Sequence, residues 1–205
     1  VIVMDISRSM ADASRFIPMK DAAKRWISYE VEDGVKLGLV FFNDKTDKPG
    51  FDLTEVSTGS KNSIIDIIDK VEAVGTTCIS AGLLKALMDE TQLNKTSGNV
   101  IILLTDGKQE GTGCPVSIIT VANRLAEFKT RVITIALGDE ADPEIEDLAE
   151  ITGGKSFYVA DNSGPGDFND AFSGSSTYQP GTIHKVTILK SKFYFQKVNL
   201  IFKYN

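Results

Sequence analysis

Short, nearly continuous runs of apolar residues alternate along this chain with longer segments in which apolar residues recur every three or four positions. The short runs are typical of strands buried on both faces, and the periodic segments are typical of amphipathic helices. The predicted strands are Val1–Met4, Val35–Phe42, Phe51–Leu53, Val100–Thr105, Val132–Leu137 and Ser156–Val159. The predicted helices are Ile17–Tyr29, Ser63–Val71, Ser80–Asp89, Pro115–Phe128 and Pro143–Ile151.

Buried strands that alternate with helices indicate a parallel sheet covered by helices on both faces. We therefore predict an α/β fold, with a doubly wound and mostly parallel sheet, for residues 1–175. The polar segments 162–166 and 173–181 contain glycine, proline and serine, and we interpret them as a loop and a linker, with the linker proper at 176–181. Two strand-like runs without an intervening helix occupy 182–205 and predict the start of an incomplete, β-sandwich-like antiparallel domain. Because apolar runs stand at both ends of the chain, we expect a piece of a longer polypeptide whose first strand is truncated.

The charge balance narrows the classes of partner. The 22 lysine and arginine residues are outnumbered by 28 aspartate and glutamate residues, so the net charge is −6, and no basic run is present. Nucleic-acid binding is therefore not expected, because contacts to phosphates need clustered positive charge. His184 is the single histidine, which excludes histidine-rich zinc sites and the HExxH motif from these residues. No apolar run approaches the roughly 20 residues that span a bilayer, so no transmembrane segment is predicted.

Oxygen-bearing side chains gather in three loops at the carboxyl ends of the predicted strands, where open α/β sheets bind ligands. Asp5, Ser7 and Ser9 follow the first strand, Gly75-Thr76-Thr77 precedes a helix, and Thr105-Asp106-Gly107 ends the fourth strand. Carboxylate and hydroxyl oxygens suit Mg²⁺, Mn²⁺ or Ca²⁺ better than zinc or copper. We expect a divalent cation there, with one coordination position left for an acidic group of a partner protein.

The order of these loops resembles the metal-ion-dependent adhesion site of von Willebrand factor type A domains, which have a Rossmann-like fold. The resemblance rests on Asp-x-Ser-x-Ser after the first strand, a threonine loop, and a strand that ends in Thr-Asp-Gly. It implies that the direct metal ligands are Asp5, Ser7, Ser9, Thr77 and Asp106. Thr77 is preferred to Thr76 because the threonine stands third in the family's Gly-Gly-Thr. Arg8 is a departure, since glycine is common there, and it would strain the loop if the backbone required glycine.

The chain also resembles the calcium-activated chloride channel regulator family. The segments that carry this resemblance are Gly75–Leu83, Leu103–Gly107, Gly113–Cys114, Ala136–Gly138, Ile151–Gly154, Phe157–Val159 and Asp170–Phe172. It implies a secreted or cell-surface protein that binds a partner carboxylate, with a chloride channel as the implied partner, and so modulates chloride conductance. The family's N-terminal zinc metalloprotease domain is not in these residues, so we do not expect this chain to be an enzyme.

Three further residues bear on location. Cys78 and Cys114 lie just past the second and third loops, and we keep two interpretations: a disulfide that ties these loops together in an oxidising compartment, or two small buried thiols. Asn94 begins an Asn-Lys-Thr sequon on a polar connection, which predicts glycosylation at the surface of an extracellular protein.

Two other functions stay open at this stage. One is an intracellular type A domain of an ATPase- or chelatase-type assembly, which would keep both cysteines reduced. The other is a Mg²⁺-dependent phosphoryl-transfer enzyme, which strand-end aspartates also suit. Such enzymes usually have a second aspartate close after the first as general acid, and Ser7 stands there instead.

Overall fold

A six-stranded sheet forms the centre of the domain. The computed structural model describes residues 1–46, 48–93, 99–107, 109, 114–139, 141–161 and 163–176. The strands are β1 (Ile2–Asp5), β2 (Lys36–Phe42), β3 (Phe51–Glu55), β4 (Val100–Thr105), β5 (Arg131–Leu137) and β6 (Lys155–Val159), in the spatial order β3-β2-β1-β4-β5-β6. Every neighbouring pair is parallel except β2 and β3, which are antiparallel at one edge. The predicted α/β fold with a mostly parallel sheet is confirmed.

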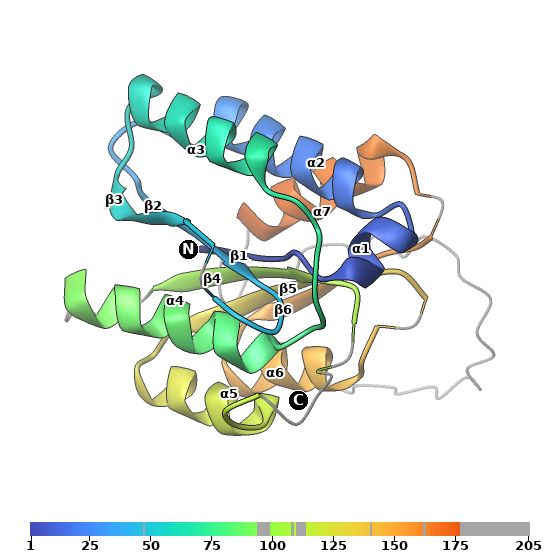
Figure 1. Ribbon diagram of the computed structural model, residues 1–205. Helices are drawn as coiled ribbons and strands as arrows, with labels where there is room; N and C mark the ends of the chain where they lie inside the picture. Colours follow the sequence, from blue (N-terminus) through green and yellow to red (C-terminus); the bar gives the residue numbers. More distant parts are fainter. Residues whose placement is uncertain are drawn as a thin grey trace, which may run out of the picture.

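Helices cover both faces of this sheet (Figure 1). On one face lie α2 (Phe16–Tyr29), α3 (Thr58–Lys70) and α7 (Pro165–Ser176), and on the other lie α4 (Ile79–Leu93), α5 (Ile118–Glu127) and α6 (Glu144–Ile151). Successive strand side chains point to opposite faces. Met4 and Leu104 therefore pack in the core under α2, α3 and α7, whereas Val3 and Leu103 pack in the core over α4, α5 and α6. Since both faces are covered, β1 and β4 carry no polar residue before their last position.

The strand order places a topological switch point at the carboxyl end of β1. The central strand β1 pairs with β2 on one side and with β4 on the other. The strands that follow β1 are added on its one side up to β3 and on its other side from β4 onwards, so the strand order reverses between β1 and β4. In open α/β sheets the crevice at such a switch point is where ligands bind. Asp5 is the last residue of β1, and Thr105 is the last residue of β4.

Polar caps place the start of two helices away from the predicted positions. α5 begins at Ile118 rather than at Pro115, because the hydroxyl of Ser117 accepts a hydrogen bond from the amide of Thr120 at 3.2 Å. α3 likewise begins several residues before the predicted start, at Thr58. The first turn of α3 is polar and carries no apolar periodicity, so the pattern placed its start too late. α5 begins with apolar residues directly after its polar cap, and Pro115, which suggested an earlier start, lies outside the helix.

Two helices were not predicted at all. One is the short α1 (Arg8–Asp12), and the other is α7, whose first two residues were interpreted as part of a loop and whose last four were interpreted as the beginning of a linker. That interpretation is wrong for Pro165 and Gly166, which begin α7, and for Ser173–Ser176, which form its last turn. The helix is rich in glycine, serine and aspartate, yet Phe168 and Phe172 are buried on one side, and the Phe172 ring lies 5.9 Å from the ring of Trp26 in α2. Tertiary packing therefore overrides weak helix propensity here.

Several predictions fall on parts of the chain outside the described residues. They concern the linker beyond Ser176, the β segment at 182–205 and the sequon at Asn94. Among the helices that the structure describes, none has the length and apolar character needed to cross a membrane.

Candidate metal centre

Asp5 is a fully buried carboxylate at the centre of the switch point. Its Oδ1 accepts a hydrogen bond from the amide of Ser7 at 2.8 Å, and its Oδ2 accepts one from the hydroxyl of Thr105 at 2.6 Å. Burial raises the pKa of Asp5 from 3.8 to about 7, although these hydrogen bonds lower it. A buried carboxylate held only by neutral donors is costly to ionise, and a cation beside it would offset that cost.

Two hydroxyls of the first loop lie beside each other, and one of them reaches the residue that follows β4. Ser7 is the N-cap residue of α1, but its side chain makes no capping hydrogen bond, and its Oγ lies 3.1 Å from Oγ of Ser9. The hydroxyl of Ser9 donates to Oδ1 of Asp106 at 2.8 Å. Hydrogen bonds therefore join the first and third loops across 97 positions of sequence.

The backbone at Arg8 does not require glycine, so the condition under which this residue would strain the loop is not met. Among the described residues other than glycine, only Ser14 and Lys129 have positive φ angles. Arg8 is instead the first residue of α1, with its backbone in a helical conformation and its side chain exposed. An arginine is therefore accommodated where glycine is common.

Asp106 lies immediately after β4, and its carboxylate has no exposed surface. Its Oδ1 accepts the bond from Ser9, and its Oδ2 accepts a hydrogen bond from Nη1 of Arg15 at 3.0 Å. Thr105, next to it, donates to Asp5 and so supports that carboxylate. The two acidic residues thus have different surroundings: Asp5 has neutral partners, and Asp106 has one cationic partner.

Thr77 belongs to the second loop and is buried beside the third. A Cβ placed on Gly107 would lie 3.4 Å from the hydroxyl oxygen of Thr77, so these two loops are in contact. The second loop is also bonded to the first, because the carbonyl of Gly75 accepts a hydrogen bond from the amide of Arg8 at 3.0 Å. All three loops therefore meet at the carboxyl end of β1 and β4.

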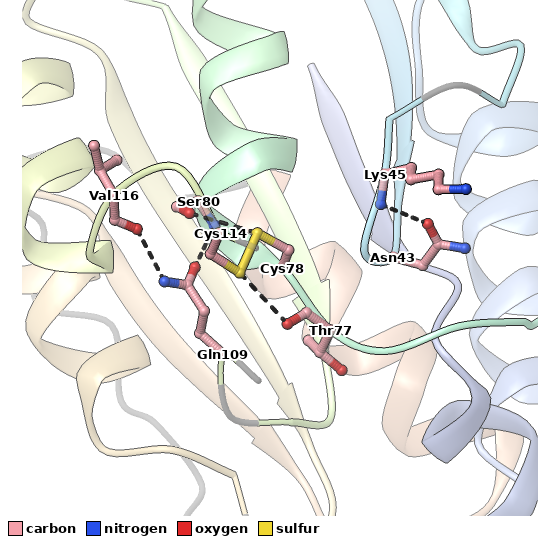
Figure 2. The surroundings of a disulfide bond; sticks show 8 residues. All are labelled: Asn43, Lys45, Thr77, Cys78, Ser80, Gln109, Cys114 and Val116. Atoms are coloured by element: carbon pink, nitrogen blue, oxygen red, sulfur yellow. Dashed lines mark hydrogen bonds between the residues drawn. A yellow bond between two sulfur atoms is a disulfide. The ribbon is translucent and has the colours of Figure 1, made fainter. Parts of the chain in front are cut away.

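A disulfide joins Cys78 and Cys114, which decides between the two interpretations of the cysteines. Figure 2 shows that it lies beside Thr77, and the Sγ atom of Cys114 is 4.0 Å from the carbonyl oxygen of Thr77. Gln109 reinforces the connection: its Oε1 accepts a hydrogen bond from the amide of Ser80 at 2.8 Å, and its Nε2 donates to the carbonyl of Val116 at 3.0 Å. The second loop is thereby fixed to the segment that follows β4.

Sequence reasoning missed two charged residues next to this centre. Arg15 binds Asp161 through two hydrogen bonds of 2.7 Å in addition to its contact with Asp106. The arginine holds the pKa of Asp161 below its usual range. One signal for Asp161 was available, since it follows β6 at the same edge of the sheet as Asp5 and Asp106, but nothing in the pattern marked Arg15 as its partner.

The donors gathered here fit a hard divalent cation. A continuous series of hydrogen bonds links Asp5 to Ser7, Ser7 to Ser9 and Ser9 to Asp106. Thr77 lies against the third loop. Over the described parts of the chain, no group of three or more histidine, cysteine, aspartate or glutamate side chains could hold a metal ion. The set described here is of another kind, because only two of its five donors are carboxylates and the other three are hydroxyls. Oxygen donors of this kind favour Mg²⁺, Mn²⁺ or Ca²⁺.

Curated relatives of the chain are calcium-activated chloride channel regulators. Regulator 1 of Bos taurus is 33% identical over 195 residues, and regulator 3A-1 of Mus musculus is 31% identical over 192 residues. Each alignment covers 93% of this chain and 20% of the relative. The chain therefore spans about a fifth of the length of the curated relatives it matches.

Solved structures share the fold. A von Willebrand factor type A protein from Catenulispora acidiphila superposes with a TM-score of 0.68 at 18% identity, over 84% of this chain and 40% of the other. Proximal thread matrix protein 1 from the mussel byssus was solved with a zinc-occupied MIDAS (metal-ion-dependent adhesion site) motif. It gives a TM-score of 0.66 at 22% identity, over 83% of this chain and 43% of the other. Residues 1–171 match the von Willebrand factor type A domain. The chain therefore belongs to the von Willebrand factor type A domain family and is similar to the calcium-activated chloride channel regulators.

Proposed function

We propose that this domain is a metal-dependent protein-binding module of a protein like the calcium-activated chloride channel regulators. In this proposal Asp5, Ser7, Ser9, Thr77 and Asp106 hold Mg²⁺, Mn²⁺ or Ca²⁺, and an acidic residue of a partner protein is the ligand. The observation that carries the proposal is the hydrogen-bonded series Ser7, Ser9 and Asp106 beside the buried Asp5. When bound, the cation supplies a Lewis-acidic position for a carboxylate oxygen.

The mixture of donors suits this task. Asp5 and Asp106 supply two negative charges, which match one divalent cation. The hydroxyls of Ser7, Ser9 and Thr77 add oxygen atoms without adding charge. A third carboxylate, supplied by a partner, is therefore not repelled by an excess of negative charge in the site.

The comparisons and the disulfide support proposals about the partner, the cation and the location of the protein. The relatives are chloride channel regulators by name, so we propose that the partner is a chloride channel and that binding modulates chloride conductance. The mussel byssus protein carries zinc at its MIDAS motif, which supports a divalent cation here. The bridge between Cys78 and Cys114 favours an extracellular or cell-surface location over a reducing intracellular assembly.

The test is cation binding followed by carboxylate binding. Isothermal titration with Mg²⁺ measures the first step, and an immobilised peptide with a single glutamate measures the second, with Mg²⁺ and with EDTA. We expect the wild-type domain to retain the peptide only with Mg²⁺, and Asp5→Asn and Asp106→Asn to lose both activities. Asp69→Asn, the same change at an exposed ion pair on α3, is the control and should behave as wild type. If both site variants bind Mg²⁺ as the wild type does, the proposal is wrong.

A further inference from the structure

Arg15 connects the candidate metal centre to a part of the fold that supplies none of its ligands. The residue stands at the start of α2, directly after Ser14, whose φ angle is 58°. Its guanidinium reaches Asp106 after β4 with one nitrogen and Asp161 after β6 with the other two. Three segments separated by 91 and 146 positions of sequence are therefore joined by one side chain.

The position of this guanidinium is built into the fold. Gly138 follows β5 with a φ angle of 86°, and a Cβ added there would lie 2.2 Å from Cζ of Arg15. The glycine therefore leaves the space in which the guanidinium lies. The Arg15 side chain is 14% exposed and the Asp106 side chain is fully buried, so this ion pair is largely shielded from water.

The pairing fixes the orientation of Asp106. Arg15 holds Oδ2, and Ser9 donates to Oδ1, so each oxygen has its own partner. Asp161 in turn accepts a bidentate pair of hydrogen bonds from Arg15. In this geometry a carboxylate fixes the orientation of an arginine most strongly. Supporting contacts of this kind keep a ligand in place without touching the metal.

We propose that Arg15 is a positioning residue of the metal centre, which holds Asp106 so that Oδ1 faces the cation together with Ser9, and that Asp161 fixes Arg15 in that role. This inference rests on the proposed function, because it requires that Asp106 is a ligand. It assigns a task to two residues that supply no oxygen or nitrogen to the cation.

The Arg15→Gln variant distinguishes a positioning role of Arg15 from a purely electrostatic one, because the two roles change the cation affinity in opposite directions. Arg15 is a positive charge close to a cation site, so its removal by Arg15→Gln should tighten cation binding if charge alone matters. If Arg15 positions Asp106, the same variant should weaken binding, and Arg15→Lys should weaken it too, because a lysine keeps the charge but not the planar fork.

The experiment measures affinities for Mg²⁺ and Ca²⁺ by isothermal titration. We expect Arg15→Gln, Arg15→Lys and Asp161→Asn to bind Mg²⁺ about 10- to 100-fold more weakly. Ca²⁺ binding should fall less, since Ca²⁺ accepts irregular coordination whereas Mg²⁺ demands a near-ideal octahedron. The ratio of the two affinities, which a general loss of stability would not change, should therefore shift against Mg²⁺. Lys24→Gln, which removes ion pairs on the same helix away from the site, should leave the ratio unchanged.

Gly138→Ala gives a test that alters no charge. Its Cβ would displace the guanidinium, so the affinity ratio should shift as in the arginine variants. Gly153→Ala is the matched control, because Gly153 also has a positive φ angle of 68° but a Cβ there meets no neighbouring atom within 4 Å.

The outcomes separate this inference from the proposed function. Mg²⁺ affinity that is unchanged or higher in Arg15→Gln, with an unchanged ratio in Asp161→Asn, would overturn the role of Arg15 alone. A wild-type domain that binds neither cation would overturn the proposed function. If Arg15→Gln does not fold, Asp161→Asn decides, since the Asp161 side chain is one-third exposed.

Discussion

At the scale of single residues, the candidate centre depends on Asp5, a carboxylate whose burial makes its ionised form unfavourable. Asp5 is fully buried, and its carboxylate accepts hydrogen bonds from neutral donors, among them the amide of Ser7 and the hydroxyl of Thr105. Burial outweighs these bonds and raises the pKa of Asp5 to about 7. The carboxylate therefore exchanges a proton near neutral pH, where a divalent cation would compete for the same oxygen atoms.

This competition predicts that Mg²⁺ binding depends on pH. A cation needs the ionised form, so the apparent affinity should rise about tenfold per unit up to a pH of about 7 and level off above it. Calorimetric titrations between about pH 5.5 and pH 8 in buffers of different ionisation enthalpy will show the proton released on binding. An affinity that is constant over this range would contradict the account of Asp5.

The same shift has a consequence for the metal-free domain. The folded state binds the Asp5 proton more tightly than the unfolded chain, whose aspartate has a pKa near 3.8. The contribution of Asp5 to the free energy of unfolding is therefore largest at low pH and declines as the pH rises from about 4 to about 7. Added Mg²⁺ should offset this decline.

At the scale of elements, strands were more predictable than helices. β4 was predicted with its observed bounds, because a fully buried strand is a continuous apolar run. α7 was missed because its two buried phenylalanines are set among glycine, serine and aspartate, so its helical face becomes apparent only against α2. α1 has five residues and a single buried side chain, Met10, which is too little for a periodic signal.

The packing of α7 leads to a stability prediction. Phe172 is fully buried, and its ring lies beside Trp26. Phe172→Ala should lower the free energy of unfolding by about 3–5 kcal/mol, because it leaves a cavity between α7 and α2. Phe128→Ala makes the same change at a side chain that is 53% exposed and should cost about 0.5 kcal/mol or less. Equal effects of the two variants in denaturant titrations would show that α7 does not pack as described.

At the scale of the whole molecule, topology explains which parts of the candidate site could be anticipated. Adjacent parallel strands end at the same edge of a sheet, so Asp5 and Asp106 were expected to converge, and they lie on neighbouring strand ends. The choice of Thr77 rested on a resemblance to a family rather than on any pattern in the sequence. The pairing of Arg15 with Asp161 could not be anticipated, because it depends on where α2 begins relative to β6 and on the space left by Gly138.

The central claim is that oxygen atoms of Asp5, Ser7, Ser9, Thr77 and Asp106 share one divalent cation. Anomalous X-ray diffraction from crystals grown with Mn²⁺ tests this most directly, because manganese scatters distinctively at its absorption edge. We predict one strong anomalous peak at the carboxyl ends of β1 and β4, about 2.2 Å from the oxygen atoms that bind it. A crystal that shows these side chains ordered with no peak among them, or with the manganese bound elsewhere, would contradict the account.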